Sequence, residues 1–321
     1  MLIVIALGGN ALLRRGEPLT AESQRANVKR AAAAMAEVIG AGHRVVVCHG
    51  NGPQVGLLAL QSEAYKPEEA YPLDVLGAQT EGMIGYIIEQ ELENALAGRK
   101  RVATLLTQVE VDADDPAFRK PTKPIGPVYS GTKAEKLARQ RGWNIAADGT
   151  GHRRVVASPL PKHIPDVSVI RILVEQDVIV ICGGGGGIPV IRRSDGSLIG
   201  IEAVIDKDRV AALLAEELGA DMLLMLTDVD AVYRYWGSSS KEPIRTMSID
   251  QIRSEEFPAG SMGPKIEAAR DFVAATGGTA GIGALGDAIG IIEGRYGTLI
   301  FSGDPTDIPP VPKFKTTGDK R

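Results

Sequence analysis

Short runs of consecutive hydrophobic residues recur along the chain and predict buried strands. Leu2–Leu7 and Val178–Cys182 are apolar at every position, which is typical of interior strands of a parallel sheet, because both faces of such strands are covered. Strands are predicted on this basis at Leu2–Leu7, Arg44–Cys48, Val102–Thr107, Val178–Cys182, Leu223–Thr227, Gly278–Ile282 and Thr298–Phe301.

Between these runs, hydrophobic residues fall at helical spacing. In Glu22–Ile39, the side chains of Val28, Ala31, Met35 and Val38 share one face of a helix. Helices are predicted at Glu22–Ile39, Val75–Ala97, Ile170–Gln176, Lys207–Leu218 and Lys265–Thr276. Because strands and helices alternate, we expect an α/β fold with an open, mostly parallel central sheet sandwiched by helices.

Three segments depart from this alternation. Asp112–Asp166 contains seven prolines and many charges, so we expect a small protruding subdomain or lid at about 116–163, inserted into a main domain of residues 1–302. Ser194–Ser197 has Asp-Gly at its centre and predicts a β-hairpin. Residues 303–321 are rich in proline and mixed charge, and we expect a peripheral tail.

Composition and charge exclude several classes of protein. A net charge of −4 and an aromatic content of 4% argue against a general nucleic-acid binder. No apolar run reaches the roughly 18 residues of a membrane span, and the first strand begins without a secretory leader. We therefore expect a cytoplasmic protein without a membrane partner. Cys48 and Cys182 end predicted core strands and are expected to be buried, unpaired thiols.

Glycine-rich turns follow three of the predicted strands. They begin at Gly8, Gly50 and Gly183, and the third consists of five consecutive glycines. The carboxyl ends of parallel strands share one edge of a sheet, and ligands bind at that edge. We therefore expect the three turns to form one pocket from backbone N–H groups, which suits phosphate or carboxylate.

Standard phosphate and metal motifs do not account for this pocket. The nearest approach to a Walker A loop, Gly126–Lys133, has its last two residues reversed and follows no core strand. The first strand lacks the Gly-x-Gly-x-x-Gly of a dinucleotide fold, and the four histidines lack the spacing of a zinc site. A serine hydrolase is unsupported because no nucleophile elbow is present.

Lysines and aspartates supply the remaining candidate chemistry. Ile205–Asp208 opens one predicted helix, and Gly260–Lys265 leads into another. Lys265 is either a solvated charge in the first helical turn or an anion-binding group. Asp206 and Asp208 are either helix N-caps or carboxylates that hold cations. A transferring phosphoryl group needs cations for its oxygens and acidic groups to hold those cations or Mg²⁺. An anion-binding Lys265 and cation-holding aspartates would therefore fit one phosphoryl-transfer site.

In their order along the chain, these motifs resemble the amino acid kinase family, and within it the enzymes that phosphorylate carbamate. The segments that carry the resemblance are Ala6–Ala11, His49–Gly56, Lys123–Pro127, Gly184–Val190, Glu202–Asp208, Leu226–Asp230 and Gly260–Lys265. Relatives that phosphorylate carboxylates have a lysine at the position of Ala6. In the carbamate-specific members, a lysine of the protruding subdomain supplies that cation.

The resemblance implies a reaction and a set of partners. The reaction is reversible, Mg²⁺-dependent transfer of a phosphoryl group between ATP plus carbamate and ADP plus carbamoyl phosphate. It is expected to run toward ATP in arginine catabolism, and the enzyme is expected to be a homodimer. Two alternatives remain: a kinase of the same fold for another small anion, or a nucleotide or anion sensor without activity. Ala6 and the protruding segment argue against acetylglutamate or aspartate as acceptor, and the retained lysines argue against a sensor.

The resemblance also implies site residues. Carbamate and the transferring phosphoryl group would be bound by Gly8, Gly9, Asn10, Gly50, Asn51, Gly184 and Gly185. The developing charge would be neutralised by Lys123, Lys207 and Lys265, with Asp208 orienting the lysines. The nucleotide site would be lined by Thr227, Asp228, Tyr233 and Met262. No metal ligand is assigned, and no general base is needed if the carbamate oxygen is already anionic.

Overall fold

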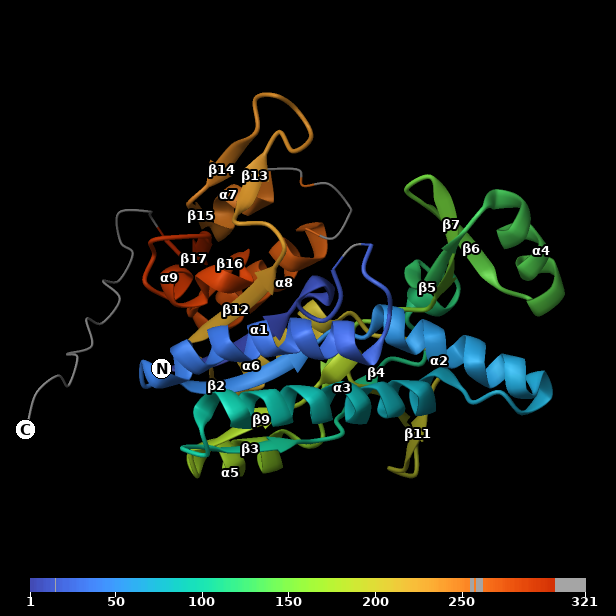
Figure 1. Cartoon of the computed structure of the whole chain (residues 1–321), viewed down its shortest axis with the longest axis horizontal. Helices are drawn as coiled ribbons and strands as arrows, with labels where there is room; N and C mark the ends of the chain where they lie inside the picture. Colours follow the sequence, from blue (N-terminus) through green and yellow to red (C-terminus); the bar gives the residue numbers. More distant parts are fainter. Residues whose placement is uncertain (15, 255–256, 258–261, 304–321) are drawn as a thin grey trace, which may run out of the picture.

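The computed structural model describes residues 1–14, 16–254, 257 and 262–303. An eight-stranded sheet forms its centre, in the order β15-β17-β16-β12-β1-β2-β9-β3 (Figure 1). These strands are β1 (Leu2–Leu7), β2 (Arg44–His49), β3 (Arg101–Thr104), β9 (Val178–Ile181), β12 (Met222–Thr227), β15 (Thr246–Ser248), β16 (Thr279–Ala284) and β17 (Thr298–Phe301). Neighbouring strands run parallel except for β16 and β17, so the expected mostly parallel sheet is confirmed.

Helices cover both faces of this sheet, as predicted. The helices are α1 (Ala21–Gly40), α2 (Gly52–Tyr65), α3 (Leu73–Leu96), α4 (Gly131–Arg141), α5 (Val167–Glu175), α6 (Lys207–Leu218), α7 (Ile249–Ser254), α8 (Met262–Thr276) and α9 (Ala288–Ile292). α1, α3 and α9 pack on one face, with α1 and α3 side by side (Figure 1). α5, α6 and α8 pack on the other face.

Alternation of side chains along β1 shows why the sheet needs two helical layers. Leu2, Val4 and Ala6 join the hydrophobic core on the side of α6 and α8. The residues between them, Ile3, Ile5 and Leu7, join the core on the side of α1 and α3. Burial of a large aliphatic side chain stabilises the fold by about 1.5–3 kcal/mol, so each face of the strand requires its own covering layer.

Two local predictions were wrong or incomplete. The strand predicted at Val102–Thr107 ends at Thr104: Leu105 still donates its N–H to Ile181, but Thr107 contacts both ends of the five-glycine turn. α2 was not predicted, since it begins in a Gly-Pro pair directly after a glycine-rich turn. Proline suits the first turn of a helix, where its missing N–H has no intrahelical partner. The predicted hairpin at Ser194–Ser197 is confirmed as the connection between β10 (Ile188–Arg192) and β11 (Leu198–Gly200).

Smaller sheets surround the central one. A four-stranded sheet has the order β11-β10-β4-β8, and β13 pairs with β14. Their strands are β4 (Gln108–Val111), β8 (Pro161–His163), β10 (Ile188–Arg192), β11 (Leu198–Gly200), β13 (Val232–Arg234) and β14 (Glu242–Ile244). The four-stranded sheet packs against α3 through β10 and against α6 through β8.

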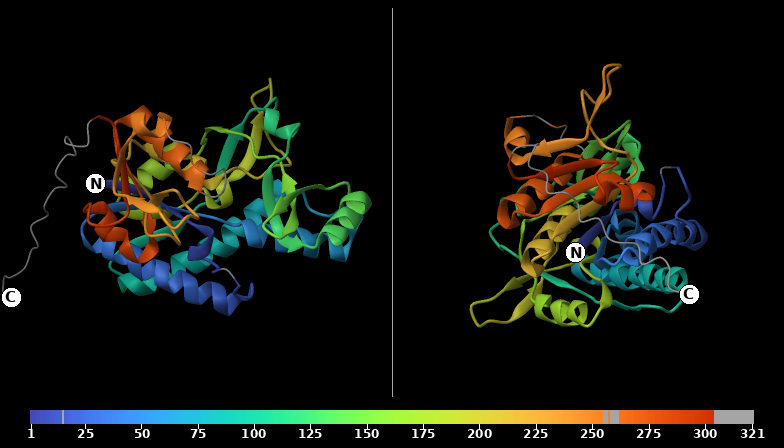
Figure 2. Two further views of the ribbon diagram at one scale, coloured as in Figure 1. Left: turned by 90° about the horizontal axis from the view of Figure 1, so that it is seen from above. Right: turned by 90° about the vertical axis from the view of Figure 1, so that its left-hand side faces the viewer.

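A third small sheet, which we call the protruding sheet, projects beside α2 (Figures 1 and 2). It consists of β5 (Lys123–Tyr129), β7 (Gly151–Val156) and β6 (Asn144–Asp148), and α4 packs on it. The sheet has its own separate ladder, and a small hydrophobic cluster that includes Val55 and Ile125 joins it to α2. The predicted tail lies outside the described residues except for Gly303.

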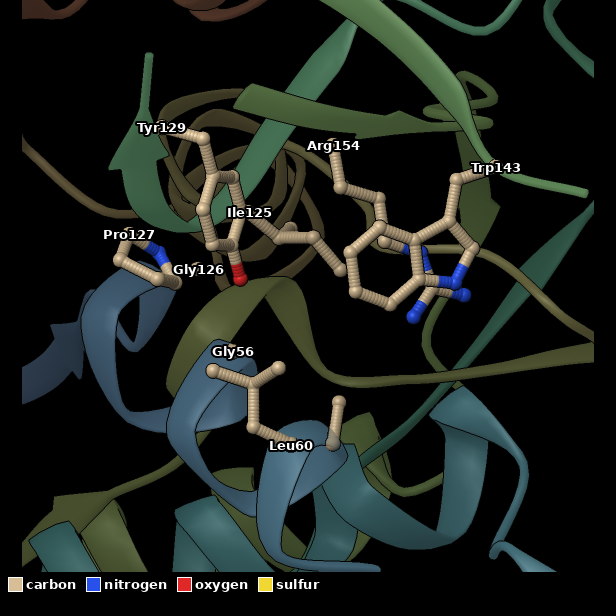
Figure 3. Close-up of a pocket in the computed structure, with 9 residues that line it drawn as sticks. Gly56, Leu60, Ile125, Gly126, Pro127, Tyr129, Trp143 and Arg154 are labelled. Atoms are coloured by element: carbon tan, nitrogen blue, oxygen red, sulfur yellow. The ribbon is translucent and has the colours of Figure 1, made fainter. Parts of the chain in front are cut away.

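The joint between α2 and the protruding sheet is a direct backbone contact. A Cβ atom placed on Gly56 of α2 would lie 2.0 Å from Cα of Gly126 in β5, so no larger residue fits without moving the strand. An apolar pocket follows this contact, and in it the Arg154 guanidinium lies 4.9 Å from the ring centre of Trp143 (Figure 3). The pocket marks the seam between the body and the protruding sheet.

Candidate active site

The three glycine-rich turns lie together at the carboxyl edge of adjacent strands β1, β2 and β9. A Cβ atom placed on Gly50 would lie 3.7 Å from the backbone nitrogen of Gly9. A Cβ atom placed on Gly185 would lie 2.1 Å from Nδ2 of Asn51, so the second and third turns also touch. Gly9 and Asn10 begin a single 3₁₀ turn, and Gly9 is exposed. The structure therefore brings the predicted glycines of all three turns to one place.

The five-glycine turn is shaped by backbone angles and by close neighbours. Gly183, Gly185, Gly186 and Gly187 have φ between +61° and +96°, which side chains with a Cβ atom rarely adopt. Gly184 has an ordinary φ, but a Cβ atom there would lie 2.3 Å from Nε2 of His49. Each position thus excludes a side chain for a physical reason, and the backbone is left bare toward the site.

Asp208 joins two lysines at the same edge. Nζ of Lys207 donates to one carboxylate oxygen of Asp208 at 2.6 Å, and Nζ of Lys265 donates to the other at 3.0 Å. Lys207 and Asp208 open α6, Lys265 lies in the first turn of α8, and the two helices pack together. Lys265 is only 7% exposed, so its interpretation as a solvated charge is wrong.

The pKa values of this cluster reflect a competition between burial and charge. Burial by itself raises the pKa of Asp208, but Lys207 and Lys265 outweigh it and hold that pKa below its usual range. Burial also outweighs Asp208 at Lys265 and, with the charge of Lys207, lowers the pKa of Lys265. At Lys207 the two aspartates outweigh burial and raise the pKa. One carboxylate shared by two lysines leaves the cluster with an excess of positive charge, which suits an anion.

Lys123 extends from the protruding sheet to the start of α6. Its Nζ donates to Oδ2 of Asp206 at 2.5 Å, and this contact is the link between the lid candidate and the lysine cluster. Asp206 also caps α6, because its Oδ1 accepts from the backbone N–H of Asp208 at 2.9 Å. Burial raises the pKa of Asp206, but Lys123 and Lys207 lower it further than burial raises it. The two readings of Asp206, cap and cation holder, are therefore both correct.

The candidate nucleotide residues are only partly brought together. Thr227 ends β12 beside the first glycine turn, where Cα of Thr227 lies 3.4 Å from a Cβ atom placed on Gly8, and Thr227 donates to Asp228 at 3.1 Å. Met262 begins α8, one turn before the lysine of that helix. Thr227 therefore lies at the first glycine turn, and Met262 shares α8 with Lys265.

Tyr233 lies apart from that group, on the β13–β14 hairpin. Its hydroxyl donates to Asp230 at 2.8 Å, and its ring lies 5.5 Å from that of Trp236. The Nζ atom of Lys241 lies over the Tyr233 ring, at 5.3 Å from its centre. These contacts run within the hairpin, so the structure does not itself join Tyr233 to the lysines.

Sequence reasoning missed the support given to the turns by four side chains: His49, Thr80, Glu81 and Thr107. All four are buried, and Asn51 donates from Nδ2 to the hydroxyl of Thr80 at 2.8 Å. A signal was present, because Thr80 and Glu81 fall on the same helical stripe as buried Leu76 and Ile84. Polar residues on the buried stripe of a helix indicate a hydrogen-bonded role.

The donor set bears on how a metal could bind. In the part of the chain that the structure describes, no three His, Cys, Asp or Glu side chains are grouped to hold a metal ion. Asp206 and Asp208 are already engaged by lysines. Mg²⁺ usually binds through substrate phosphates and few protein ligands, so this site fits an ion that arrives on a nucleotide.

A membrane-spanning helix is absent from the part of the chain that the structure describes, because no helix there has the length and apolar character that a span requires.

Comparison with known proteins agrees with this geometry. A profile described as the amino acid kinase family matches residues 1–282, and the chain belongs to that family. Carbamate kinase of Rhizobium meliloti is 55% identical over 304 residues, covering 94% of each chain. Carbamate kinase of Haemophilus influenzae is 54% identical over 300 residues, covering 94% of this chain and 96% of its own. The chain is therefore a phosphotransferase, as the family resemblance predicted.

Solved structures extend the agreement to the fold. Carbamate kinase from Giardia lamblia bound to citric acid is 38% identical and superposes with a TM-score of 0.89, covering 94% of this chain and 98% of its own. The same enzyme bound to AMP-PNP, also 38% identical, superposes with a TM-score of 0.86 at the same coverage. The predicted amino acid kinase fold is confirmed.

We expect Lys265→Ala to lower turnover about 10²–10³-fold while the protein stays folded, because one preorganised charge donor is removed from the site. Lys207→Ala should cause a parallel loss. Lys162→Ala is the matched control, since Lys162 pairs with Asp112 on the exposed surface. Steady-state kinetics with circular dichroism measures both properties. Near-normal turnover of folded Lys265→Ala would return this residue to a structural role.

Proposed function

We propose that this protein is a carbamate kinase, which transfers a phosphoryl group reversibly between ATP plus carbamate and ADP plus carbamoyl phosphate. The observation that carries the proposal is the buried Lys207–Asp208–Lys265 cluster at an edge formed by three glycine-rich turns. Its place in a chain 55% identical to a carbamate kinase supports the choice of acceptor. Ala6, buried in β1, supports it too, because β1 then brings no cation to the site.

The chain's own residues would act mainly by position and charge. A carbamate oxygen forms a bond to the γ-phosphorus while the bond from that phosphorus to the ADP oxygen breaks. The turns at Gly8, Gly50 and Gly184 would direct N–H groups at the reacting anions, and Lys207 and Lys265 would balance the charge that spreads over the phosphoryl oxygens. Asp208 would hold both lysines before the substrates arrive. Mg²⁺, when bound with the nucleotide, would neutralise phosphate charge.

The attacking oxygen of carbamate is already anionic, so the reaction needs no proton acceptor. The described site is consistent with that requirement. Burial lowers the pKa of His49 to about 4, and its Nδ1 contacts the backbone oxygen of Gly50 at 3.0 Å. His49 is therefore neutral and supports the second turn.

We propose that the enzyme works in the cytoplasm, toward ATP formation in arginine catabolism.

The purified protein should form ATP from ADP and carbamoyl phosphate when Mg²⁺ is present, and form little product from ATP with acetylglutamate or aspartate. A coupled assay of ATP measures the first reaction, and release of ADP measures the others. These two assays also distinguish the two alternatives, a sensor without activity and a kinase for another small anion. Binding of ATP without ATP formation would favour a sensor, and faster transfer to acetylglutamate would show that the substrate is wrong.

We also propose that the protein is a homodimer that pairs through α3. The exposed side chains of Val75, Met83 and Tyr86 lie along one face of this helix, opposite the face that packs on the sheet. Apolar groups gathered on an exposed helix face mark contact surfaces more often than scattered ones do. Sedimentation should give twice the mass of the chain, and Tyr86→Lys should reduce it. A monomer at micromolar concentration would contradict the proposal.

The segment at about 116–163 is proposed as the lid that carries Lys123 into the site. It contacts α2 through the Gly56–Gly126 backbone approach, a small hydrophobic cluster and ion pairs from Arg141 and Arg154 to Glu63, so we propose that the protruding sheet and α4 move against α2 as a unit. Lys123 reaches Asp206 across that joint. Lids of this kind complete a catalytic site only when they close.

Lys123→Ala should therefore lower kcat by about 10²-fold while the KM for nucleotide changes little, because the ammonium group would meet the transferring phosphoryl group and not the nucleoside. Lys133→Ala is the matched control: Lys133 lies in α4, which packs on the protruding sheet, and its Nζ is 5.5 Å from the ring centre of Tyr129. Initial-rate kinetics on both variants tests the assignment. Unchanged kcat in Lys123→Ala would mean that the third cation comes from elsewhere.

A further inference from the structure

Glu81 is a carboxylic acid buried beneath the five-glycine turn. It lies in the middle of α3, it is 1% exposed, and its Cγ is 2.9 Å from a Cβ atom placed on Gly184. A carboxyl group is costly to bury unless hydrogen bonds compensate it. No role in binding or transfer has been given to this residue, so its burial against the site needs an explanation.

We propose that Glu81 is a positioning residue for phosphoryl transfer, which acts through Thr107 to hold the five-glycine turn in its substrate-binding conformation. The expected effect of Glu81 on turnover rests on the proposed function. The support that Glu81 gives to the turn rests only on contacts among buried residues, and it can be measured without an activity assay.

Thr107 connects Glu81 to both ends of the turn. The backbone N–H of Thr107 donates to Oε2 of Glu81 at 3.0 Å. The hydroxyl oxygen of Thr107 accepts from the N–H of Gly183 at 2.9 Å, and its carbonyl oxygen accepts from the N–H of Ile188 at 2.8 Å. Thr107 is fully buried. Glycine residues do not hold their own conformation, so a support that grips the first glycine and the residue after the last one is what this turn requires.

Thr80, the preceding residue of α3, supports the second turn in the same way. Its hydroxyl donates to the carbonyl oxygen of Gly77 at 2.7 Å and accepts from Nδ2 of Asn51 at 2.8 Å. Asn51 in turn touches Gly185. Consecutive residues of one helix therefore hold two of the three turns, and a displacement at Glu81 would be transmitted to both.

The surroundings of Glu81 decide its protonation. Burial raises the pKa of Glu81, the N–H groups of Thr107 and Gly184 lower it in part, and the negative charge of Asp166 raises it. The net result is a pKa of about 8. The other titratable groups that face it, the His49 imidazole and the Cys182 thiol, are both neutral near pH 7, since burial lowers the pKa of His49 and the pKa of Cys182 is raised. Among the described residues, Oε1 of Glu81 has no hydrogen-bond partner. Glu81 is thus a neutral acid at pH 7.

The test compares Glu81→Gln, Glu81→Ala and Glu91→Ala in the full-length protein. Glutamine keeps the shape, the acceptor and the neutrality of Glu81, so its kcat should stay within about threefold of the unmodified protein. Alanine removes the support of Thr107, and kcat should fall about 10²-fold with little change in the nucleotide KM, since a 1 Å misplacement in a site costs that much. Glu91 is the matched control: it is a buried acid of the same helix, 3.0 Å from Arg25 and about 15 Å further along.

Hydrogen–deuterium exchange provides a readout that does not depend on activity. Amides of residues 183–188 should exchange faster in Glu81→Ala and at the original rate in Glu91→Ala and Glu81→Gln. If the unmodified protein forms no ATP, the proposed function fails while this comparison still decides the role of Glu81. Unchanged exchange and unchanged kcat in Glu81→Ala would overturn the inference, as would equal losses in Glu81→Ala and Glu91→Ala.

The melting temperature adds a test of protonation. A pKa raised from the ordinary 4.5 to about 8 means that the folded state keeps a proton which the unfolded state has lost. Relative to Glu81→Gln, the unmodified protein should be most stable below pH 4.5, lose stability between pH 4.5 and 8, and stay level above pH 8. A constant difference across this range would show that Glu81 is ionised in the folded protein and would overturn its role as a neutral support.

Discussion

Two buried ammonium groups that share one carboxylate are the constraint around which this molecule is arranged. Lys207 and Lys265 come from different helices, and both contact Asp208, which is 4% exposed. Removing one partner of a buried ion pair costs about 3–5 kcal/mol, because the other charge is left without compensation in a medium of low polarity. The packing of α6 on α8 is therefore coupled to the electrostatics of the site, and a bound anion would complete the charge balance.

The glycine-rich turns complement this cluster, because they supply N–H groups and no side chains. Their freedom is also a weakness, since a run of glycines has no preferred conformation. The fold compensates from behind the turns. α3 supplies Thr80 and Glu81, the chain after β3 supplies Thr107, and β2 supplies His49. The side that faces the ligand stays bare backbone, and the side that faces the core carries the hydrogen bonds that hold it.

The protruding sheet brings a third lysine to the start of α6, beside the two that share Asp208. Lys123 reaches Asp206 from β5, and Asp206 caps the helix that begins with Lys207. The ion pair and the helix cap thus join the protruding sheet to the start of the lysine cluster. The bare backbones of Gly56 and Gly126 let this sheet approach α2 closely, and ion pairs from Arg141 and Arg154 to Glu63 add to the contact.

Much of this architecture could be predicted from the sequence. The apolar runs identified the core strands, and the five glycines identified the third turn, because steric exclusion and burial leave a direct mark on residue type. Lys265 was recognised as a candidate anion ligand because a glycine-rich loop and a proline precede it, and Lys207 was assigned through the family resemblance. α2 was not predicted, since its Gly-Pro start directly follows a glycine-rich turn. The early end of β3 was not predicted, since Thr107 contacts a turn more than 70 residues further along the chain.

The sequence by itself determined the alternation of strands and helices, the positions of the bare turns and the kinds of charge near them, because each depends on local conformation or hydrophobic burial. Only the tertiary structure decided the partners. That Asp208 holds two lysines, that Asp206 meets Lys123 and that Glu81 supports Thr107 follow from atoms brought together across separations of 57, 83 and 26 residues. Hydrogen bonds and ion pairs act over about 3 Å, so their partners are set by the folded positions of the backbone and not by neighbours in the sequence.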